Sequence, residues 1–450
     1  MLYRKIENKI ARYLRSKQDR VMVVSGARQI GKSYIIRYIG KKLFANYVEL
    51  NLIDNAEMRK AFGSVENLND FHLVLSAFAG ERLGNREDTL IFIDEIQESP
   101  NLLTMLKFLK QEDRYCYIAS GSLLGVTLKH THSIPVGSIE IENMWPLDFE
   151  EFLIANDFSG EAMDYLRECF HKLESPKPEI NSRVMDLFRR YLLVGGMPAA
   201  VNEFIETHNL VKVRSVQRDI HSLYEADASK YDLEHKLKIR RIYNLIPSNM
   251  ESKKKRLVYK DIEEKKGKRS GDYEEEVEYL ISSGVALEVK AISNPKFPLI
   301  ETEQKNLIKL YLNDVGLLSG ILYNMNPAPV LKDEASINLG SLYECVVATE
   351  LAAHGHKLFY YDNRKNGEVD YLIDDYSSLH VVPLEVKSGK DYRIHSALSR
   401  FVNTPDYHIE RGYVLSNSGE ITLKGAIAYI PVYMSMFFDA SGGEDEIIPI

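Results

Sequence analysis

Short apolar runs alternate with amphipathic stretches along the first third of the chain. Five of these runs are candidate strands, the first and third with the apolar character of a buried strand. They cover residues 21–25, 47–52, 90–94, 115–119 and 138–142. Between the first two runs, Ile35, Ile36 and Ile39 share one face of a helical pattern over residues 34–43. This alternation of strand and helix predicts an α/β domain with a parallel sheet over residues 1–155.

The pattern changes several times after residue 155. Residues 156–235 are helical in pattern and are broken by the proline-containing LESPKPEIN, so we expect a helical lid. Residues 236–320 predict three short helices followed by a two-stranded ribbon, which is the order of a winged helix. Residues 321–335 are rich in turn residues and predict a linker. Residues 336–450 alternate again and predict a second α/β domain.

Composition narrows the class of protein. Hydrophobic residues make up 45% of the 450 residues and charged residues 27%, as expected for a globular chain of several domains. The net charge of −8 means that any nucleic-acid surface must be local. The distant Cys116, Cys169 and Cys345 argue against a zinc site and favour a reducing compartment. The charged N-terminal stretch is not a signal peptide, and no apolar run is long enough to span a membrane, so we expect a cytoplasmic protein.

The segment GARQIGKS, residues 26–33, follows the first predicted strand and precedes the first helix of the sheet. It fits the pattern G-x-x-x-x-G-K-[ST], whose backbone N–H groups cradle phosphate oxygens at a helix N-terminus. Lys32 would reach the β- and γ-phosphates of ATP, and the Ser33 hydroxyl would hold Mg²⁺. The complete motif between strand and helix favours this interpretation over an ordinary glycine-rich turn. We expect the nucleotide to contact Gly26, Ala27, Arg28, Gln29, Ile30, Gly31, Lys32, Ser33 and Tyr34.

A second motif, LIFIDE, ends another predicted strand at Asp94. Ligands of open α/β sheets bind at the carboxyl ends of the strands, so Asp94 would orient Mg²⁺ there. Glu95 would act as the general base that activates the attacking water. Together with Lys32, these two carboxylates are the expected catalytic residues. The alternative is that both only cap the following helix, SPNLLTMLKFLK.

Four charged residues near the C-terminus form a separate pattern. A helix beginning near Ser341 carries Glu344 in its first turn, and a later strand carries Asp370. Glu385 and Lys387 are two apart on the next strand and therefore share a face. A hairpin through DDYSS would bring Asp370 beside Glu385, where two carboxylates could hold Mg²⁺ and a lysine could orient water. Alternatively, these are surface charges of an unrelated sheet, or a site that binds without catalysis.

The order of the motifs resembles that of prokaryotic AAA-like P-loop ATPases. Members of that family carry a C-terminal domain of unknown function that is thought to resemble the PD-(D/E)xK nuclease fold. The resemblance rests on GARQIGKS, LIFIDEIQ, IASGSLL, PLDFEEFL, YLLVGGMPAAV, LYLNDVGLL and GEVDYLI with LEVKSG. It implies a P-loop NTPase core followed by a nuclease-like α/β domain. The implied nuclease-like site is Glu344, Asp370, Glu385 and Lys387, with Asp370 and Glu385 as metal ligands.

The resemblance also bears on residues around the γ-phosphate. It implies that Ser120 or Ser122 is a sensor of that phosphate, although both could equally be turn residues. The family often has an arginine where this chain has Ser138. The remaining candidates for an arginine finger are Arg28, Arg189 and Arg190, and none is convincing. Slow or partner-dependent hydrolysis is therefore expected.

The charged residues of the predicted winged helix limit the ways in which it could bind DNA. Its third helix would carry five carboxylates, which argue against insertion into a major groove. They are Asp272, Glu274, Glu275, Glu276 and Glu278. Two basic runs, residues 253–256 and 265–269, flank the second helix. They either contact DNA phosphates without reading bases or form a solvated loop surface, which we favour.

These observations predict a Mg²⁺-dependent ATP-binding protein, an ATPase, that couples nucleotide state to a C-terminal nuclease-like or nucleic-acid-binding module. The alternative is a nucleotide-gated interaction switch with slow hydrolysis and no nuclease activity, which Ser138 modestly favours. The expected partners are ATP and DNA bound through non-specific phosphate contacts, with no membrane. An oligomer is compatible with the sequence.

Overall fold

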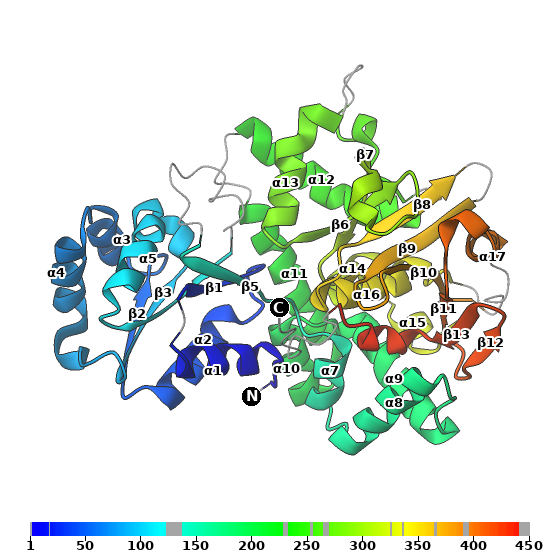
Figure 1. Cartoon of the computed structure of the whole chain (residues 1–450), viewed down its shortest axis with the longest axis horizontal. Helices are drawn as coiled ribbons and strands as arrows, with labels where there is room; N and C mark the ends of the chain where they lie inside the picture. The colour runs from blue at the N-terminus through cyan, green and yellow to red at the C-terminus, as the bar shows by residue number, and fades with distance from the viewer. Residues whose placement is uncertain are drawn as a thin grey trace. The chain divides into compact units, whose positions relative to one another are not determined.

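The computed structural model describes most of the chain (Figure 1). The described residues are 2–17, 19–122, 137–227, 233–252, 255–263, 270–324, 326–334, 337–363, 367–389 and 396–440. The chain divides into two compact units. The first consists mainly of Tyr3–Trp145 with Glu278–Val285, and the second of Pro146–Val277 with Ala286–Ile450. No helix among the described residues is long and apolar enough to cross a bilayer.

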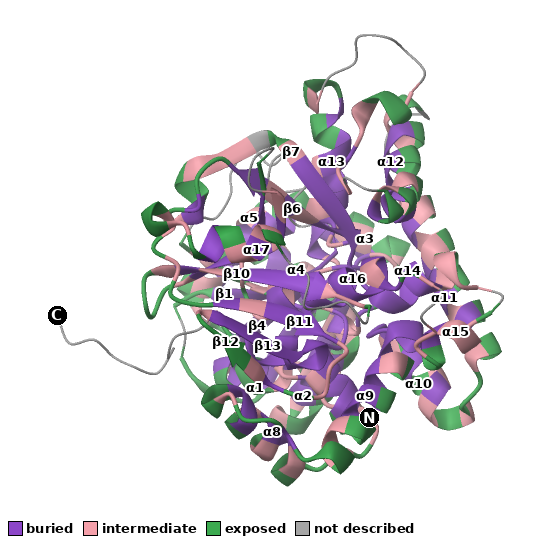
Figure 2. Ribbon diagram, turned by 90° about the vertical axis from the view of Figure 1, so that its right-hand side faces the viewer, coloured by how far each residue is buried: buried purple, intermediate pink, exposed green. Residues whose placement is uncertain are grey.

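The first unit contains a five-stranded parallel sheet in the order β2-β3-β4-β1-β5. Its strands are β1 (Val21–Ser25), β2 (Asn46–Asn51), β3 (Thr89–Asp94), β4 (Cys116–Gly121) and β5 (Ile139–Asn143). The predicted parallel sheet is therefore confirmed, and each strand lies within two residues of its predicted position. Every residue of β1, β3 and β4 is buried, as expected for central parallel strands, and Figure 2 shows β1 and β4 in purple.

Helices accompany this sheet in the predicted alternation. They are α1 (Ile6–Arg15), α2 (Lys32–Leu43), α3 (Ala56–Gly63), α4 (Leu68–Ala79) and α5 (Pro100–Glu112). Apolar residues of α3, α4 and α5, such as Phe62, Leu75 and Leu106, pack with Ile91 and Ile93 of β3 in one buried cluster. Burial of each such side chain contributes about 1.5–3 kcal/mol, and this core fixes the strand ends that carry the predicted site.

The N-terminal half of the second unit is helical. Its helices are α7 (Phe149–Ala155), α8 (Gly160–Lys172), α9 (Pro178–Val194), α10 (Pro198–Thr207), α11 (Leu210–Asp227) and α12 (Leu233–Glu251). Residues 173–177 of the segment LESPKPEIN separate α8 from α9, and Pro178 is the first residue of α9, where the missing N–H group costs nothing.

An eight-stranded mixed sheet forms the rest of the second unit, in the order β12-β13-β11-β10-β9-β8-β6-β7. The strands are β6 (Ala286–Ile292), β7 (Glu303–Leu312), β8 (Phe359–Asn363), β9 (Gly367–Asp375), β10 (His380–Lys387), β11 (Gly412–Ser416), β12 (Thr422–Lys424) and β13 (Ile427–Pro431). Its helices include α14 (Val315–Leu322), α15 (Ala328–Leu331), α16 (Gly340–Ala353) and α17 (Ser396–Val402). Helix α16 contacts β6, β7 and β10, whereas α17 contacts β9 and β10.

The predicted winged helix over residues 236–320 differs from the structure. Helices α12 and α13 (Glu274–Ser282) are present, but the described part of the second predicted helix is a 3₁₀ turn, Tyr259–Asp261. The predicted two-stranded ribbon is present, because β6 pairs antiparallel with β7, but β6 also pairs parallel with β8 on its other edge. Residues 290–292 of β6 therefore join the ribbon to the C-terminal sheet. The predicted linker contains the short helix α15.

Candidate functional site

The phosphate loop has the backbone geometry that only glycine adopts readily. Gly26 has φ 144° and Gly31, which caps α2, has φ 94°. A Cβ atom on Gly26 would lie 2.2 Å from the carbonyl oxygen of Met144. Both glycines of the motif are therefore required by the shape of the loop, and α2 begins at Lys32 with its N–H groups at the end of the loop.

Lys32 folds over its own loop. Its Nζ atom donates hydrogen bonds to the carbonyl oxygens of Gly26 at 3.0 Å and Ala27 at 2.8 Å. The side chain is buried, so the ammonium group is held against the loop rather than extended into solvent. A cation in this position can interact with the phosphates of a nucleotide seated on the loop.

Asp94 and Ser33 meet at the carboxyl end of β3. The Ser33 hydroxyl donates to Asp94 Oδ1 at 2.8 Å, and the Ser120 hydroxyl donates to the same oxygen. Burial raises the pKa of Asp94, although both hydroxyl groups oppose this shift. The hydroxyl and carboxylate oxygens are hard ligands of the kind that Mg²⁺ prefers, so they fit this ion. Neither carboxylate of the motif caps the next helix, because α5 begins after Ser99.

Glu95 is held by two donors. Its backbone is left-handed with φ 57°, and its Oε2 atom accepts from Ser122 Oγ at 2.9 Å and from Gln97 Nε2 at 2.5 Å. Burial alone would raise the pKa of Glu95, but the charge of Lys32 and the two hydrogen bonds lower it. Glu95 is therefore ionised at neutral pH, as a general base must be.

The sequence did not predict a role for Gln97. Its place in the motif LIFIDEIQ, two residues after Glu95, could have indicated such a role. No periodicity in the sequence, however, predicted that the chain turns back there. A 3₁₀ turn, Ile96–Glu98, brings its amide onto the Glu95 carboxylate.

The sensor and arginine candidates have different surroundings. Ser120 and Ser122 bond to Asp94 and Glu95, so both hydroxyl groups belong to the carboxylate network. Arg28 donates from Nε to Ser122 Oγ at 3.4 Å. In the second unit, Arg189 pairs with Asp186 on α9 at 2.7 Å and Arg190 is exposed. Ser138 accepts the Val21 N–H group through its backbone oxygen at 2.8 Å.

The structure brings the four predicted C-terminal residues together in the second unit. Lys387 Nζ lies 2.7 Å from Glu385 Oε1, and the Val386 N–H group donates to Asp370 Oδ2 at 2.8 Å. Pairing of β9 with β10 places Asp370 opposite Glu385, one residue beyond Tyr371 and Leu384.

Glu344 approaches from α16, in the second turn rather than the predicted first. Its carboxylate accepts the Tyr311 hydroxyl at 3.1 Å and forms an ion pair with Lys255. Lys255 is a second residue that the sequence did not assign to this site, because its contact with Glu344 spans 89 positions of the chain.

Burial and mutual repulsion dominate the electrostatics of this C-terminal site. Burial, followed by the charge of Asp370, raises the pKa of Glu385 to about 8. The same two causes raise the pKa of Glu344. Glu385 is 5% exposed, and its Oε2 atom has no hydrogen-bond partner in the described part of the chain. The site therefore favours a proton or a cation between its carboxylates.

Several described charges of the predicted winged helix are paired within the protein. Of the two basic runs, only Lys255 and Arg256 are described; the other six basic residues lie outside the described residues. Lys255 pairs with Glu344 and Arg256 with Asp362. On α13, Glu276 is buried and lies 2.9 Å from His235. A solvated basic loop is therefore wrong for residues 255 and 256, because both reach carboxylates of the C-terminal sheet region.

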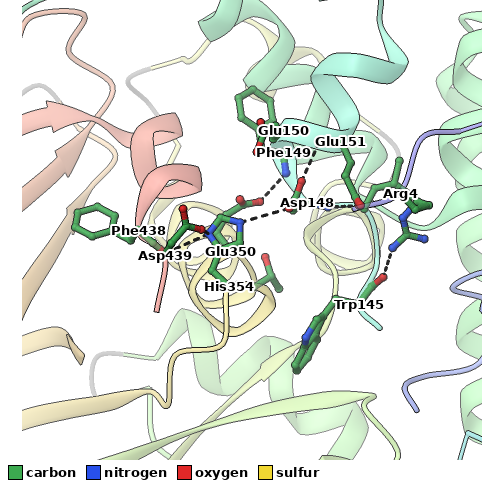
Figure 3. Close-up of polar contacts among 12 residues, drawn as sticks. Arg4, Trp145, Asp148, Phe149, Glu150, Glu151, Glu350, His354, Phe438 and Asp439 are labelled. Carbon is green, nitrogen blue, oxygen red and sulfur yellow. Dashed lines mark hydrogen bonds and ion pairs between the residues drawn. The ribbon is translucent and has the colours of Figure 1, made fainter. Parts of the chain in front are cut away.

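Asp148, Glu350 and His354 form another buried cluster (Figure 3). One ligand atom from each lies within 4.8 Å of the others, which is a spacing that a metal ion could use. Both carboxylates already accept N–H groups of α7, however. Asp148 Oδ1 accepts from Glu151 and Glu350 Oε1 accepts from Phe149, each at 2.8 Å. We therefore interpret the cluster as the cap that attaches the start of α7 to α16.

Three known family models match separate segments of the chain. Residues 18–153 match a family model described as "AAA domain". Residues 185–327 and 339–434 match two models described as domains of unknown function, DUF8612 and DUF4143. None of the curated proteins matches the chain. The first unit thus carries a P-loop core of the AAA type, in agreement with its loop, its parallel sheet and its carboxylates.

Several solved structures are weakly similar to this chain. The Walker-type ATPase PABY2304 of Pyrococcus abyssi is 12% identical, covers 72% of this chain and 96% of its own, and has a TM-score of 0.41. The Thermotoga maritima RuvB Holliday junction branch migration motor is 14% identical, with coverages of 63% and 89% and a TM-score of 0.29. The S. cerevisiae Hsp104–ADP complex is 11% identical, with coverages of 63% and 38% and a TM-score of 0.30.

Proposed function

We propose that this protein binds ATP with Mg²⁺ at residues 26–33 and hydrolyses it. The observation that carries the proposal is the convergence of Ser33, Asp94 and Glu95 beside one phosphate loop. Ser33 and Asp94 share a hydrogen bond of 2.8 Å, and Glu95 follows Asp94 directly. A phosphate-binding loop alone would explain binding, but the adjacent ionised carboxylate supports hydrolysis.

Each residue has a separate task in this proposal. The N–H groups at the start of α2 bind phosphate oxygens, and Lys32 interacts with the β- and γ-phosphates. Ser33 and Asp94 would hold Mg²⁺, which neutralises phosphate charge when bound. Glu95 accepts a proton from the water that attacks the γ-phosphate, and Ser122 keeps its carboxylate oriented.

Steady-state hydrolysis by a Glu95→Gln variant tests this assignment. We expect the variant to bind ATP normally and to lose turnover by about 10²–10⁴-fold, because the phosphate contacts remain while the base is absent. Glu98→Gln, the same chemical change in the 3₁₀ turn that follows Glu95, is the matched control and should hydrolyse at the parent rate. Turnover of Glu95→Gln at the parent rate would move the catalytic base elsewhere.

We further propose that the C-terminal site of Glu344, Asp370, Glu385 and Lys387 binds Mg²⁺ and cleaves phosphodiesters, as its resemblance to PD-(D/E)xK nucleases implies. The buried Oε2 atom of Glu385, with no hydrogen-bond partner among the described residues, supports this second function. Asp370 and Glu385 would hold the ion, and Lys387 would orient water or stabilise charge on the phosphate.

Nicking of supercoiled plasmid and cleavage of single-stranded DNA, each with Mg²⁺ or Mn²⁺, test the second function. Glu385→Ala should abolish cleavage and leave ATP hydrolysis intact, because the two sites belong to different units. Glu420→Ala, which removes an exposed carboxylate, is the control. Absence of cleavage by the parent protein with either metal would instead support a nucleotide-gated switch without nuclease activity.

A further inference from the structure

Gln97 is a buried polar residue, and among the described residues only the nitrogen of its side-chain amide forms hydrogen bonds. It is 8% exposed and lies in the 3₁₀ turn Ile96–Glu98 that follows β3. Its Nε2 atom donates to Glu95 Oε2 at 2.5 Å and to Ser122 Oγ at 3.4 Å. Its Oε1 atom is buried without a hydrogen-bond partner in the described part of the chain.

The orientation of this amide follows from its neighbours. Turning the amide over would place Oε1 against Glu95 Oε2, and two acceptors repel each other at that distance. The nitrogen must therefore face Glu95, and the oxygen is left as the atom without a partner. A buried acceptor of this kind costs about 1–3 kcal/mol, so its retention calls for a physical reason.

The backbone and the side chain of Glu95 are also held in place. Its left-handed backbone is uncommon for a residue with a side chain and is maintained by the turn that contains Gln97. Both hydrogen bonds to its carboxylate in the described residues reach Oε2. Oε1 is thus the oxygen through which Glu95 can accept a proton. Since the oxygen and nitrogen of an amide share one carbon atom, Gln97 Oε1 lies close to this carboxylate.

We infer that Gln97 is a catalytic residue of the proposed ATPase that fixes both the base and the attacking water. Its Nε2–H group holds Glu95, and its Oε1 atom accepts a hydrogen bond from the water. As the water oxygen bonds to the γ-phosphorus, the bond from that phosphorus to the bridging oxygen breaks and ADP leaves. One water proton passes to Glu95 Oε1, and the other stays with the new phosphate, directed at Gln97 Oε1. This inference rests on the proposed hydrolysis.

Substitutions at Gln97 separate this role from packing. Gln97→Met keeps the length of the side chain but removes both the donor and the acceptor. We expect kcat to fall on the order of 100-fold with ATP affinity unchanged, because the contacts of Gln97 are to the base and the water and not to the phosphate loop. Gln97→Glu keeps an acceptor but loses the donor and adds a like charge beside Glu95, so it should not rescue kcat. Gln111→Met on α5 is the exposed control.

A double-variant cycle gives the decisive result. If Gln97 acts with Glu95 as one unit, Glu95→Gln/Gln97→Met should be no slower than Glu95→Gln alone. Additive losses, or a Gln97→Met variant with the parent kcat, would overturn the inference. A loss of kcat that is matched by losses of ATP affinity and melting temperature would also overturn it, in favour of packing. If the parent protein binds ATP but does not turn it over, the proposed ATPase function fails first and the inference fails with it.

Discussion

At the residue scale, Asp314 links two sequence motifs that lie outside the nucleotide site. Its Oδ2 atom accepts the Gly196 N–H group at 2.5 Å, and its Oδ1 atom accepts that of Leu317 at 2.9 Å. A Cβ atom on Gly195 would lie 2.2 Å from Asp314 Oδ1. The glycine pair of YLLVGGMPAAV and the aspartate of LYLNDVGLL are therefore in buried contact within the second unit.

Asp314 also makes stability depend on pH. Burial raises its pKa to about 6 despite the N–H groups that stabilise its charge. Because the unfolded chain then loses this proton first, the stability that Asp314 contributes falls as the pH rises from about 4 to 6. One pKa unit corresponds to about 1.4 kcal/mol, so the loss approaches 3 kcal/mol.

The Asp314→Asn variant isolates this effect because asparagine does not titrate. We expect the difference in unfolding free energy, parent minus variant, to shrink between pH 4.5 and 7. Urea unfolding followed by circular dichroism at both pH values measures it. A difference that grows with pH would mean that the charged form is the favoured one in the folded protein.

The roles of residues within a sequence motif were predictable, whereas the roles of residues whose partners are distant in sequence were not. Ser33 and Asp94 follow from motifs whose strand and helix place them at one sheet edge, and the structure places them 2.8 Å apart. Lys255 looked like part of a basic surface run, since nothing near it in sequence reveals Glu344 as its partner. Gln97 was missed because its role depends on a turn rather than on a periodic pattern.

At the element scale, α7 begins in an unusual concentration of acceptors. Asp148 and Glu151 form a capping box, and Glu350 of α16 accepts the Phe149 N–H group. His354 Nε2 lies 3.4 Å from Asp148 Oδ2. A helix of this length depends on its cap and on packing, so these contacts fix the segment PLDFEEFL on the C-terminal sheet domain.

Asp148→Ala should destabilise the second unit by roughly 1–2 kcal/mol, because the N-cap acceptor is lost. Asp148→Asn keeps an acceptor for the Glu151 N–H group and should lose less. Urea unfolding midpoints compare the two variants. Equal losses would show that the charge opposite His354 matters more than the cap. A rise in melting temperature with Zn²⁺ that disappears in His354→Gln would make the cluster a metal site instead.

Strand positions were predicted well, whereas the long-range pairing of β6 was not. The five strands of the first sheet lie within two residues of the predicted runs, including the partly exposed edge strand β5. The ribbon of β6 and β7 was also found, but its pattern does not say whether the second edge of β6 stays open. That edge is filled by β8, which begins 67 positions after Ile292. Pairing across such a separation depends on the tertiary fold.

At the scale of the whole molecule, the two units hold different candidate sites. The first contains the phosphate loop with its carboxylates, and the second contains the C-terminal carboxylate site. The three family matches follow one another along the chain, and two of them are to domains of unknown function. The central claim, ATP binding at the phosphate loop, therefore concerns the first unit alone. The coupling of nucleotide state to the C-terminal module and the helical lid at residues 156–235 stay predictions.

Equilibrium binding of ATP to the parent protein and to Lys32→Ala tests the central claim most directly. Lys32 lies 2.8 Å from the Ala27 carbonyl oxygen within the loop, so its removal takes away the cation that would face the phosphates. Calorimetry with Mg²⁺ present should show saturable binding by the parent and little or none by Lys32→Ala, with both proteins equally folded by circular dichroism. Lys60→Ala on α3 is the control and should bind like the parent. Unchanged ATP affinity in Lys32→Ala would contradict the assignment of this loop.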